Sequence, residues 1–270
     1  MKKIILLAGG GDLPNQVINS LKNKKISFFC ISFEKNPIPK NLDKKHHKVI
    51  NFGEVITELK KLQKNGFKKI IMIGNINRPK ISEIKPDLNS IKLIPEFTKT
   101  LLSGGDNYLL NFVINKLQKI GFIILDMRDI LPNSFLGKGN QTITNVSRAN
   151  KKDIKKGKLI LDTISKFDIG QSLVIQNGNV IGIETIHGTD YLIKSCSLLK
   201  NNSKDNILIK LVKKKQNLKV DLPTIGLKTL KNCKANSIGG IAYSANKTLF
   251  VNKNEIIEFC NSNKIFLHGI

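Results

Sequence analysis

Short, uninterrupted apolar runs alternate with segments of helical periodicity over the first half of the sequence, and this alternation restricts the fold more than any other feature. The apolar runs have the length of buried strands and comprise Ile4–Ala8, Ile26–Phe33, Lys69–Ile73 and Phe122–Leu125. Helical patterns lie between them, near residues 12–22, 53–63, 94–102 and 106–120. Strands that alternate with helices form parallel sheets with helices on both faces. We therefore predict an α/β protein whose first domain, residues 1–132, contains a doubly wound parallel sheet.

The sequence changes character after this domain. Residues 133–147 are rich in Gly, Asn, Thr and Ser and have little periodicity, which predicts a linker. In residues 148–270, Asn177-Gly178-Asn179 lies between two apolar runs and is a strong hairpin signal. Helical patterns are found near residues 151–166, 224–236 and 252–263, and further strands are expected at 207–219, 239–242 and 248–251. These features predict a second, α+β domain.

The net charge of +25 restricts the class of partner. Only three of the 45 basic residues are arginines, Trp is absent and Tyr occurs three times. Nucleic-acid readers depend on Arg for bidentate contacts and on aromatic rings for stacking, so we expect no nucleic-acid partner. A general positive field suits a phosphorylated substrate or an anionic membrane surface.

The cysteines and the apolar runs indicate a cytoplasmic protein. The four cysteines lie far apart and match no CxxC spacing of a metal or redox site, and Cys30 and Cys260 have apolar surroundings typical of a core. The apolar run after Met1-Lys2-Lys3 is too short for a signal peptide. No run approaches the length of a membrane span. We expect at most a peripheral contact with the inner-membrane surface.

The first glycine-rich stretch, Gly9-Gly10-Gly11-Asp12, joins the first strand to the first helix. Glycines let the backbone approach an anion, and the following helix points its amides at it, so this loop predicts a nucleotide or phosphate site. The fit to the dinucleotide fingerprint is weaker. Glu34 lies at the position of the ribose-binding acid, but Pro14 stands where the third glycine belongs. The alternative is a tight turn without chemical function.

Two further polar loops belong to the first domain. Gly74-Asn75-Ile76-Asn77-Arg78-Pro79 follows a strand, at the carboxyl edge where open α/β sheets bind ligands. Its amides and guanidinium could recognise a uracil or ribose and hold a phosphate. Gly105 and Asp106 open a helix and are either a cap or a third part of the same site. A solvated loop is the alternative for the asparagines.

In the second domain, polar groups are found where strands and helices end, at Asp168, Gln171, Glu184, Thr189, Asp190 and Asp221. The carboxylates among them are hard oxygen ligands that suit Mg²⁺. Asp221 follows a basic segment, and Pro223 disfavours helix at the residue before it, so Asp221 is expected on a bend at the end of a strand. A capping role is the alternative for each of these residues.

Six short motifs and a glycine turn follow one another along the chain: AGGGDLP, GNINRP, GGDN, DIGQ, HGTD, VDLPTIG and Gly239-Gly240-Ile241. In this order, from about Ile4 to Gly269, they resemble the LpxI family, the UDP-2,3-diacylglucosamine pyrophosphatases of lipid A biosynthesis. The resemblance implies a Rossmann-like first domain, a second domain of family-specific fold, and a substrate bound between them. It also implies Mg²⁺-dependent hydrolysis of the UDP-sugar lipid to UMP and 2,3-diacylglucosamine 1-phosphate.

The resemblance also implies roles for individual residues. The family's essential aspartate corresponds to Asp221, which we expect to orient or deprotonate water or to hold the metal, with Glu184 and Asp190 as further metal ligands. Together with the loops described above, the candidate substrate contacts are Gly10, Gly11, Asp12, Asn75, Gly105, Asp106, Gln171, Thr189, Asp190 and Thr224. Family members often carry an acid before Gly-Thr-Asp, where this chain has His187. The alternatives are a non-catalytic nucleotide-binding protein and an NAD-dependent oxidoreductase.

Overall fold

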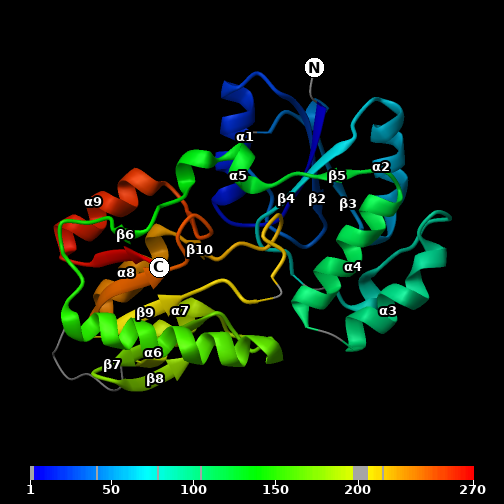
Figure 1. The fold of residues 1–270 in the computed structure, drawn as a ribbon. Helices are drawn as coiled ribbons and strands as arrows, with labels where there is room; N and C mark the ends of the chain where they lie inside the picture. Colours follow the sequence, from blue (N-terminus) through cyan, green and yellow to red (C-terminus); the bar gives the residue numbers. More distant parts are fainter. Residues whose placement is uncertain (1–2, 41, 78, 104, 197–205, 215) are drawn as a thin grey trace. The chain divides into compact units, whose positions relative to one another are not determined.

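The computed structural model describes residues 3–40, 42–77, 79–103, 105–196, 206–214 and 216–270. It divides the chain into two compact units, Met1–Leu131 and Pro132–Ile270 (Figure 1). Residues 133–147, predicted as a linker, are instead part of the second unit. Leu136 lies in its core, and strand β6 (Gly139–Asn140) pairs with β13 (Phe266–Gly269). The strand β6 has only two residues, which is too short to show a periodicity in the sequence.

The first unit contains a five-stranded sheet in the order β3-β2-β1-β4-β5, and every pair of neighbours is parallel. The strands are β1 (Lys3–Ala8), β2 (Ser27–Phe33), β3 (His47–Ile50), β4 (Lys69–Ile73) and β5 (Ile123–Ile124). The helices are α1 (Leu13–Asn23), α2 (Val55–Lys64), α3 (Ile94–Ser103), α4 (Asp106–Lys119) and α5 (Met127–Ile130). Helices α1 and α5 lie on one face of the sheet, and α2 and α4 on the other (Figure 1). The predicted parallel α/β architecture is confirmed.

The strand β3 is not among the strands predicted from the apolar runs of the sequence. His47 begins this edge strand, pairs with Cys30 of β2, and its Nε2 lies 3.1 Å from Ser32 Oγ. Burial lowers the pKa of the His47 imidazole. A strand rich in Lys and His shows no apolar alternation because it lies at the edge of the sheet, where charged side chains reach solvent.

The second unit contains a mixed six-stranded sheet in the order β6-β13-β11-β9-β7-β8. Its remaining strands are β7 (Ser172–Gln176), β8 (Asn179–Ile183), β9 (Asn206–Lys210) and β11 (Ile238–Tyr243). The strands β13, β11 and β9 are mutually parallel, whereas β7 is antiparallel to both β9 and β8. The hairpin predicted at Asn177-Gly178 is the turn between β7 and β8.

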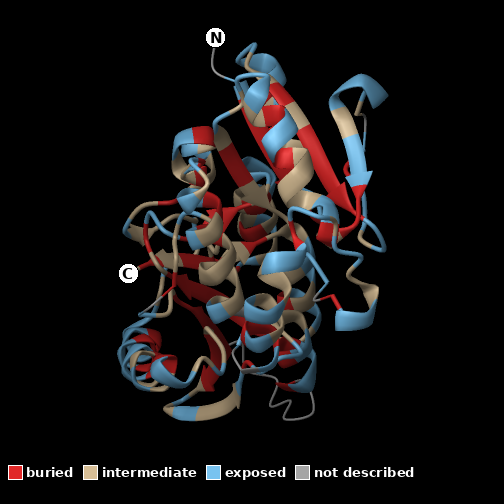
Figure 2. Ribbon diagram, turned by 90° about the vertical axis from the view of Figure 1, so that its right-hand side faces the viewer, coloured by how far each residue is buried: buried red, intermediate tan, exposed pale blue. Residues whose placement is uncertain are grey.

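Both faces of this sheet are covered by helices, because neighbouring strand residues point to opposite sides. Leu173 and Ile175 of β7 pack with α6 (Arg148–Ile164), whereas Val174 between them belongs to the other core cluster. That second cluster includes residues of α7 (Thr189–Ser195), α8 (Leu227–Ala235) and α9 (Lys253–Asn263). Figure 2 shows the result, with buried strands inside each unit and helices exposed along their outer faces.

The segment that leads to Asp221 differs from the prediction. The expected strand at residues 207–219 ends at Lys210, and Asp221 follows a turn in which its backbone N–H donates to Asn217 O at 2.9 Å. After Asp221 the chain forms β10 (Thr224–Ile225), which pairs with β12 (Leu249–Phe250), and only then enters α8. The lysines that follow Lys210 do not favour a strand over a turn. The pairing of β9 with β7 therefore determines where β9 ends.

All four cysteines are free and buried, so the predicted core role of Cys30 and Cys260 is confirmed. Burial raises the pKa of each of these two thiols to about 12, which makes thiolate chemistry unfavourable at neutral pH.

Candidate functional site

The glycine loop and the asparagine loop of the first unit meet at the carboxyl ends of β1 and β4. The backbone N–H of Gly9 donates to Ile73 O at 2.8 Å. Gly10 and Asn75 exchange two backbone hydrogen bonds of 2.8 and 3.0 Å. Because the strand order reverses between β1 and β4, this junction is the topological switch point at which doubly wound sheets bind ligands. The sequence therefore predicted correctly that the two loops share one edge of the sheet.

Close backbone approach explains the glycines at this junction. A Cβ added to Gly9 would lie 2.4 Å from Asn75 O. Gly74 has a φ of +88° and approaches Gly10 O. By contrast, Gly11 is exposed, has open space where a Cβ would lie, and has a φ of +98°, a conformation that favours glycine.

Helix α1 begins directly after this loop, with Asp12 at its N-cap position. The Asp12 side chain makes no capping hydrogen bond, and Pro14 stands in the first turn. The first helical N–H groups are therefore not used by the Asp12 carboxylate. Pro14 has no N–H, so the amides of Leu13 and Asn15, with the positive end of the helix dipole, are the first-turn donors that could bind an anion beside Gly10 and Gly11.

Among the described residues, the remaining candidates of the first unit make no hydrogen bond with this junction. Gly105 is the N-cap residue of α4, and its carbonyl accepts from Tyr108 N and Leu109 N, as in an ordinary helix start. Arg78, Gly104 and the side chain of Asp106 lie outside the described residues.

In the second unit, several of the predicted polar residues surround one buried lysine, Lys210. Its Nζ donates to Thr189 Oγ1 at 2.6 Å and to Ser172 Oγ at 3.4 Å, and lies 3.9 Å from Glu184 Oε1. Lys210 is 4% exposed and Glu184 is 7% exposed, so this ion pair is almost completely removed from water. Burial lowers the pKa of the Lys210 ammonium, while the carboxylates of Glu184, Asp221 and Asp190 oppose that shift.

Glu184 is held ionised by its surroundings. Thr189 Oγ1 donates to Glu184 Oε1 at 2.7 Å, and the backbone N–H of Gln171 donates to Oε2 at 3.2 Å. Burial alone would raise the pKa of Glu184, but the charge of Lys210 and these hydrogen bonds outweigh it and lower the pKa below its ordinary value. Thr189 thus joins the lysine and the carboxylate, and it fixes the start of α7.

The DIGQ motif anchors the loop that leads from Lys210 to Asp221. Asp168 forms an ion pair with Lys213 of this loop. Gln216 Nε2 donates to Gln171 Oε1 at 3.1 Å, and Leu211 N donates to Gln171 O at 2.8 Å. The contact of Gln171 seen here is therefore with the loop after β9, which positions the turn from which Asp221 emerges.

Asp190 and Asp221 differ in how far their carboxylates are engaged. Asp190 Oδ1 accepts from Thr229 of α8 at 3.1 Å, and Oδ2 lies 3.5 Å from the exposed Lys228 ammonium. Asp221 is half-exposed, and within the described ranges its carboxylate has no hydrogen-bond or ion-pair partner. The Thr224 hydroxyl donates to Leu222 O at 3.0 Å, which stabilises the bend through Pro223.

Only some of these residues are suitable ligands for Mg²⁺. Magnesium uses one or two carboxylates and completes its shell with water and phosphate oxygens. In the part of the chain that the structure describes, no group of three or more His, Cys, Asp or Glu residues is placed to hold a metal ion. Both oxygens of Glu184 are engaged within the fold, so it does not suit a metal ligand. Asp221, with a half-exposed carboxylate, fits such a role.

Lys210 was not among the site residues predicted from the sequence. It is one lysine among many, and its partners come from β7, from the end of β8 and from α7. A lysine at the end of a buried strand is unusual, and this was the one local clue, since lysines are almost never fully buried without a partner.

No helix among the described residues has the length and hydropathy needed to cross a lipid bilayer.

Comparisons with known proteins cover both units. The sequence-family model described as the LpxI N-terminal domain matches residues 3–134, and the model described as the LpxI C-terminal domain matches residues 137–268. One relative, the UDP-2,3-diacylglucosamine pyrophosphatase LpxI of Caulobacter vibrioides, is 27% identical over 276 residues. That alignment covers 100% of this chain and 98% of the relative.

Proposed function

Because this chain belongs to the LpxI family, we propose that it hydrolyses the pyrophosphate of UDP-2,3-diacylglucosamine, the substrate in the name of the Caulobacter relative. The proposed products are UMP and 2,3-diacylglucosamine 1-phosphate, in lipid A biosynthesis. The observation that carries the proposal is the Asp221 carboxylate, half-exposed and without an internal partner among the described residues, beside the buried cation Lys210.

The first unit is proposed to bind the uridine diphosphate part of the substrate. The backbone amide of the exposed Gly11 and the start of α1, where Asp12 makes no capping hydrogen bond, are the proposed donors to phosphate oxygens. The side chain of Asn75, which is exposed next to Gly10, adds an amide at the same edge. The net charge of +25 favours the approach of such an anionic substrate, and of an anionic membrane surface.

Asp221 is proposed to act on the attacking water. Its carboxylate accepts a hydrogen bond from water and takes up the proton when the oxygen attacks phosphorus. One P–O bond forms to the water oxygen, and the bridging P–O bond of the anhydride breaks. Bound Mg²⁺ would neutralise charge on the phosphate oxygens. The buried Lys210–Glu184 pair holds Thr189 and the surrounding loops in place around this reaction.

The acyl chains need an apolar surface. Ile183 and Ile186 flank Glu184 in the chain, and Ile169 precedes Gly170, which contacts Glu184. Ile169, Ile183 and Ile186 are 47%, 37% and 92% exposed, and Gly170 packs directly against the Glu184 backbone. A contiguous apolar patch beside a polar site is typical of a surface that receives an apolar ligand. We propose this surface for the acyl chains.

The direct test is to incubate the protein with UDP-2,3-diacylglucosamine and Mg²⁺ in ¹⁸O water and to analyse the products by mass spectrometry. Release of UMP supports the function, and the labelled product identifies the phosphorus that is attacked. Asp221→Ala is expected to lower the rate by about 10²–10⁴, the usual effect of removing an acid–base group. Substrate that stays intact with the wild-type protein, or near wild-type turnover by the variant, would contradict the proposal.

A further inference from the structure

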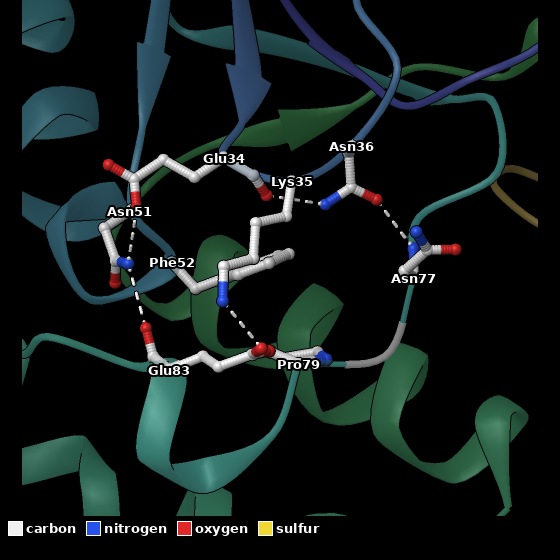
Figure 3. A pocket seen from close by; sticks show the side chains of 8 residues that line it. All are labelled: Glu34, Lys35, Asn36, Asn51, Phe52, Asn77, Pro79 and Glu83. Carbon is white, nitrogen blue, oxygen red and sulfur yellow. Dashed lines mark hydrogen bonds and ion pairs between the residues drawn. The ribbon is translucent and has the colours of Figure 1, made fainter.

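A polar cavity lies in the first unit, at the carboxyl ends of β2 and β3 (Figure 3). It is lined by residues that follow three different strands: Glu34, Lys35 and Asn36 after β2, Asn51 and Phe52 after β3, and Asn77, Pro79 and Glu83 after β4. Because β2 is the neighbour of β1 in the sheet, this cavity lies one strand away from the glycine loop.

Asn51 fixes the carboxylate of Glu34 inside this cavity. Its Nδ2 donates to Glu34 Oε2 at 2.9 Å and to Glu83 O at 2.9 Å. Its Oδ1 accepts from Gly53 N at 3.0 Å and from Lys85 N at 2.8 Å. The buried amide therefore uses all of its donors and acceptors within the fold. One oxygen of Glu34 is held, and the other has no hydrogen bond among the described residues.

The turn after β2 is attached to both ligand loops. Asn36 Oδ1 accepts from Asn77 N of the asparagine loop at 2.7 Å, and Asn36 Nδ2 donates to Glu34 O at 3.0 Å. Pro37 of the same turn packs against Gly10, where an added Cβ would lie 2.9 Å from its ring. The cavity and the glycine loop are therefore parts of one continuous edge, and a ligand with its phosphate on the loop can extend into the cavity.

The chemistry of the lining matches a ribonucleoside. An acid about 20 residues after the glycine loop, at the end of the second strand, accepts from ribose hydroxyls in dinucleotide-binding sheets. Glu34 stands at that place with one carboxylate oxygen available. Phe52, whose ring stacks on Phe33 with centroids 4.5 Å apart, provides an apolar wall, and the amides of Asn36 and Asn77 provide polar groups at the rim.

We propose that this cavity is a ribonucleoside subsite in which the Glu34 carboxylate accepts hydrogen bonds from the ribose hydroxyls and Asn51 positions that carboxylate. The inference rests on the proposed function, which supplies the uridine diphosphate. It assigns to this cavity the recognition of ribose, and it makes Glu34 the residue that distinguishes ribose from 2′-deoxyribose.

The test is to titrate the intact protein with UDP, 2′-deoxy-UDP and inorganic pyrophosphate by calorimetry. A hydrogen bond to a charged acceptor contributes enough for wild-type protein to bind UDP about 10- to 100-fold more tightly than 2′-deoxy-UDP. Glu34→Gln is expected to reduce this ratio to about threefold or less, because a neutral amide oxygen is a weaker acceptor. The affinity for pyrophosphate should be the same in Glu34→Gln as in wild type. Glu96→Gln, which removes an exposed carboxylate on α3 paired with Lys116, is the matched control and should keep the wild-type ratio.

Equal binding of the two nucleotides by wild type, an unchanged ratio in Glu34→Gln, or no binding of UDP would each overturn the subsite. Hydrolysis of the lipid substrate, measured on the same preparations, separates the two proposals. Turnover without ribose discrimination would leave the proposed function standing and remove the subsite. Ribose discrimination that depends on Glu34, without turnover, would keep the subsite and remove the function. Circular dichroism confirms that each variant is folded.

Discussion

The buried ion pair of the second unit leads to a strong prediction about stability. Lys210→Met keeps the length of the side chain but leaves the Glu184 carboxylate buried without its cation. At the observed separation of 3.9 Å between Nζ and Oε1, the pair interaction is about 4 kcal/mol for an effective dielectric of about 20. Removing one partner of a buried pair costs about 3–5 kcal/mol, because the other charge stays desolvated. We therefore expect a loss of about 4 kcal/mol in the second unit.

The assay must report on each unit separately, and the sequence contains no Trp for fluorescence. Hydrogen exchange followed by mass spectrometry reports on each unit separately and needs no Trp. Peptides from β7 and β9 should lose protection in Lys210→Met, while peptides from β1 and β2 in the first unit keep theirs and act as an internal reference. Lys228→Met is the matched control, because Lys228 also lies near a carboxylate, Asp190, but its side chain is 81% exposed. Exposed pairs of this kind contribute about 0–1 kcal/mol.

If Lys210→Met loses no more protection than Lys228→Met, burial of the unpaired Glu184 carboxylate does not carry the expected cost. A double-mutant cycle with Glu184→Gln then identifies the cause. A coupling energy of several kcal/mol between the two positions is expected if the pair acts as a unit. Additive effects of the two substitutions would instead show that Lys210 is stabilised by Thr189 and Ser172 alone.

Three further predictions concern pH, backbone contacts and metal dependence. The folded-state pKa of Glu184 lies below its unfolded value, so its carboxylate stabilises the fold above about pH 4.5. This contribution is lost as the pH falls. The melting temperature of Glu184→Gln should therefore differ most from that of wild type at pH 7, and the two should converge in acid. Gly9→Ala, whose Cβ would lie 2.4 Å from Asn75 O, should cost about 1–3 kcal/mol in urea unfolding followed by circular dichroism, whereas Gly137→Ala, in open space, should stay within about 0.5 kcal/mol. Chelation of divalent cations should abolish UMP release, and added Mg²⁺ should restore it. A higher Mg²⁺ requirement in Asp221→Asn would identify Asp221 as a metal ligand rather than a base. Activity that survives chelation would remove the metal from the proposal.

The sequence by itself determined the features that depend on local backbone chemistry. The run Ile4–Ala8 followed by glycines specified a buried parallel strand, a loop that approaches a neighbouring backbone, and a helix start. Asn177-Gly178 specified a hairpin, since it supplies the left-handed conformations that a two-residue turn requires. The placement of Asn75 beside Gly10 also followed from the sequence, because parallel strands bring their carboxyl ends to one edge.

Only the tertiary structure decided which polar groups meet. The only local feature that distinguishes Lys210 from the other lysines is its place at the end of an apolar run. Its partners Ser172 and Thr189 reach it through the pairing of β9 with β7 and the placement of α7. Likewise, Asn51 reaches Glu34 only because β3, a strand without apolar alternation, pairs beside β2. Periodicity and turn residues are properties of neighbouring residues. The burial of a charge and the identity of its partner are set by long-range pairing, which becomes known only when the sheet is assembled.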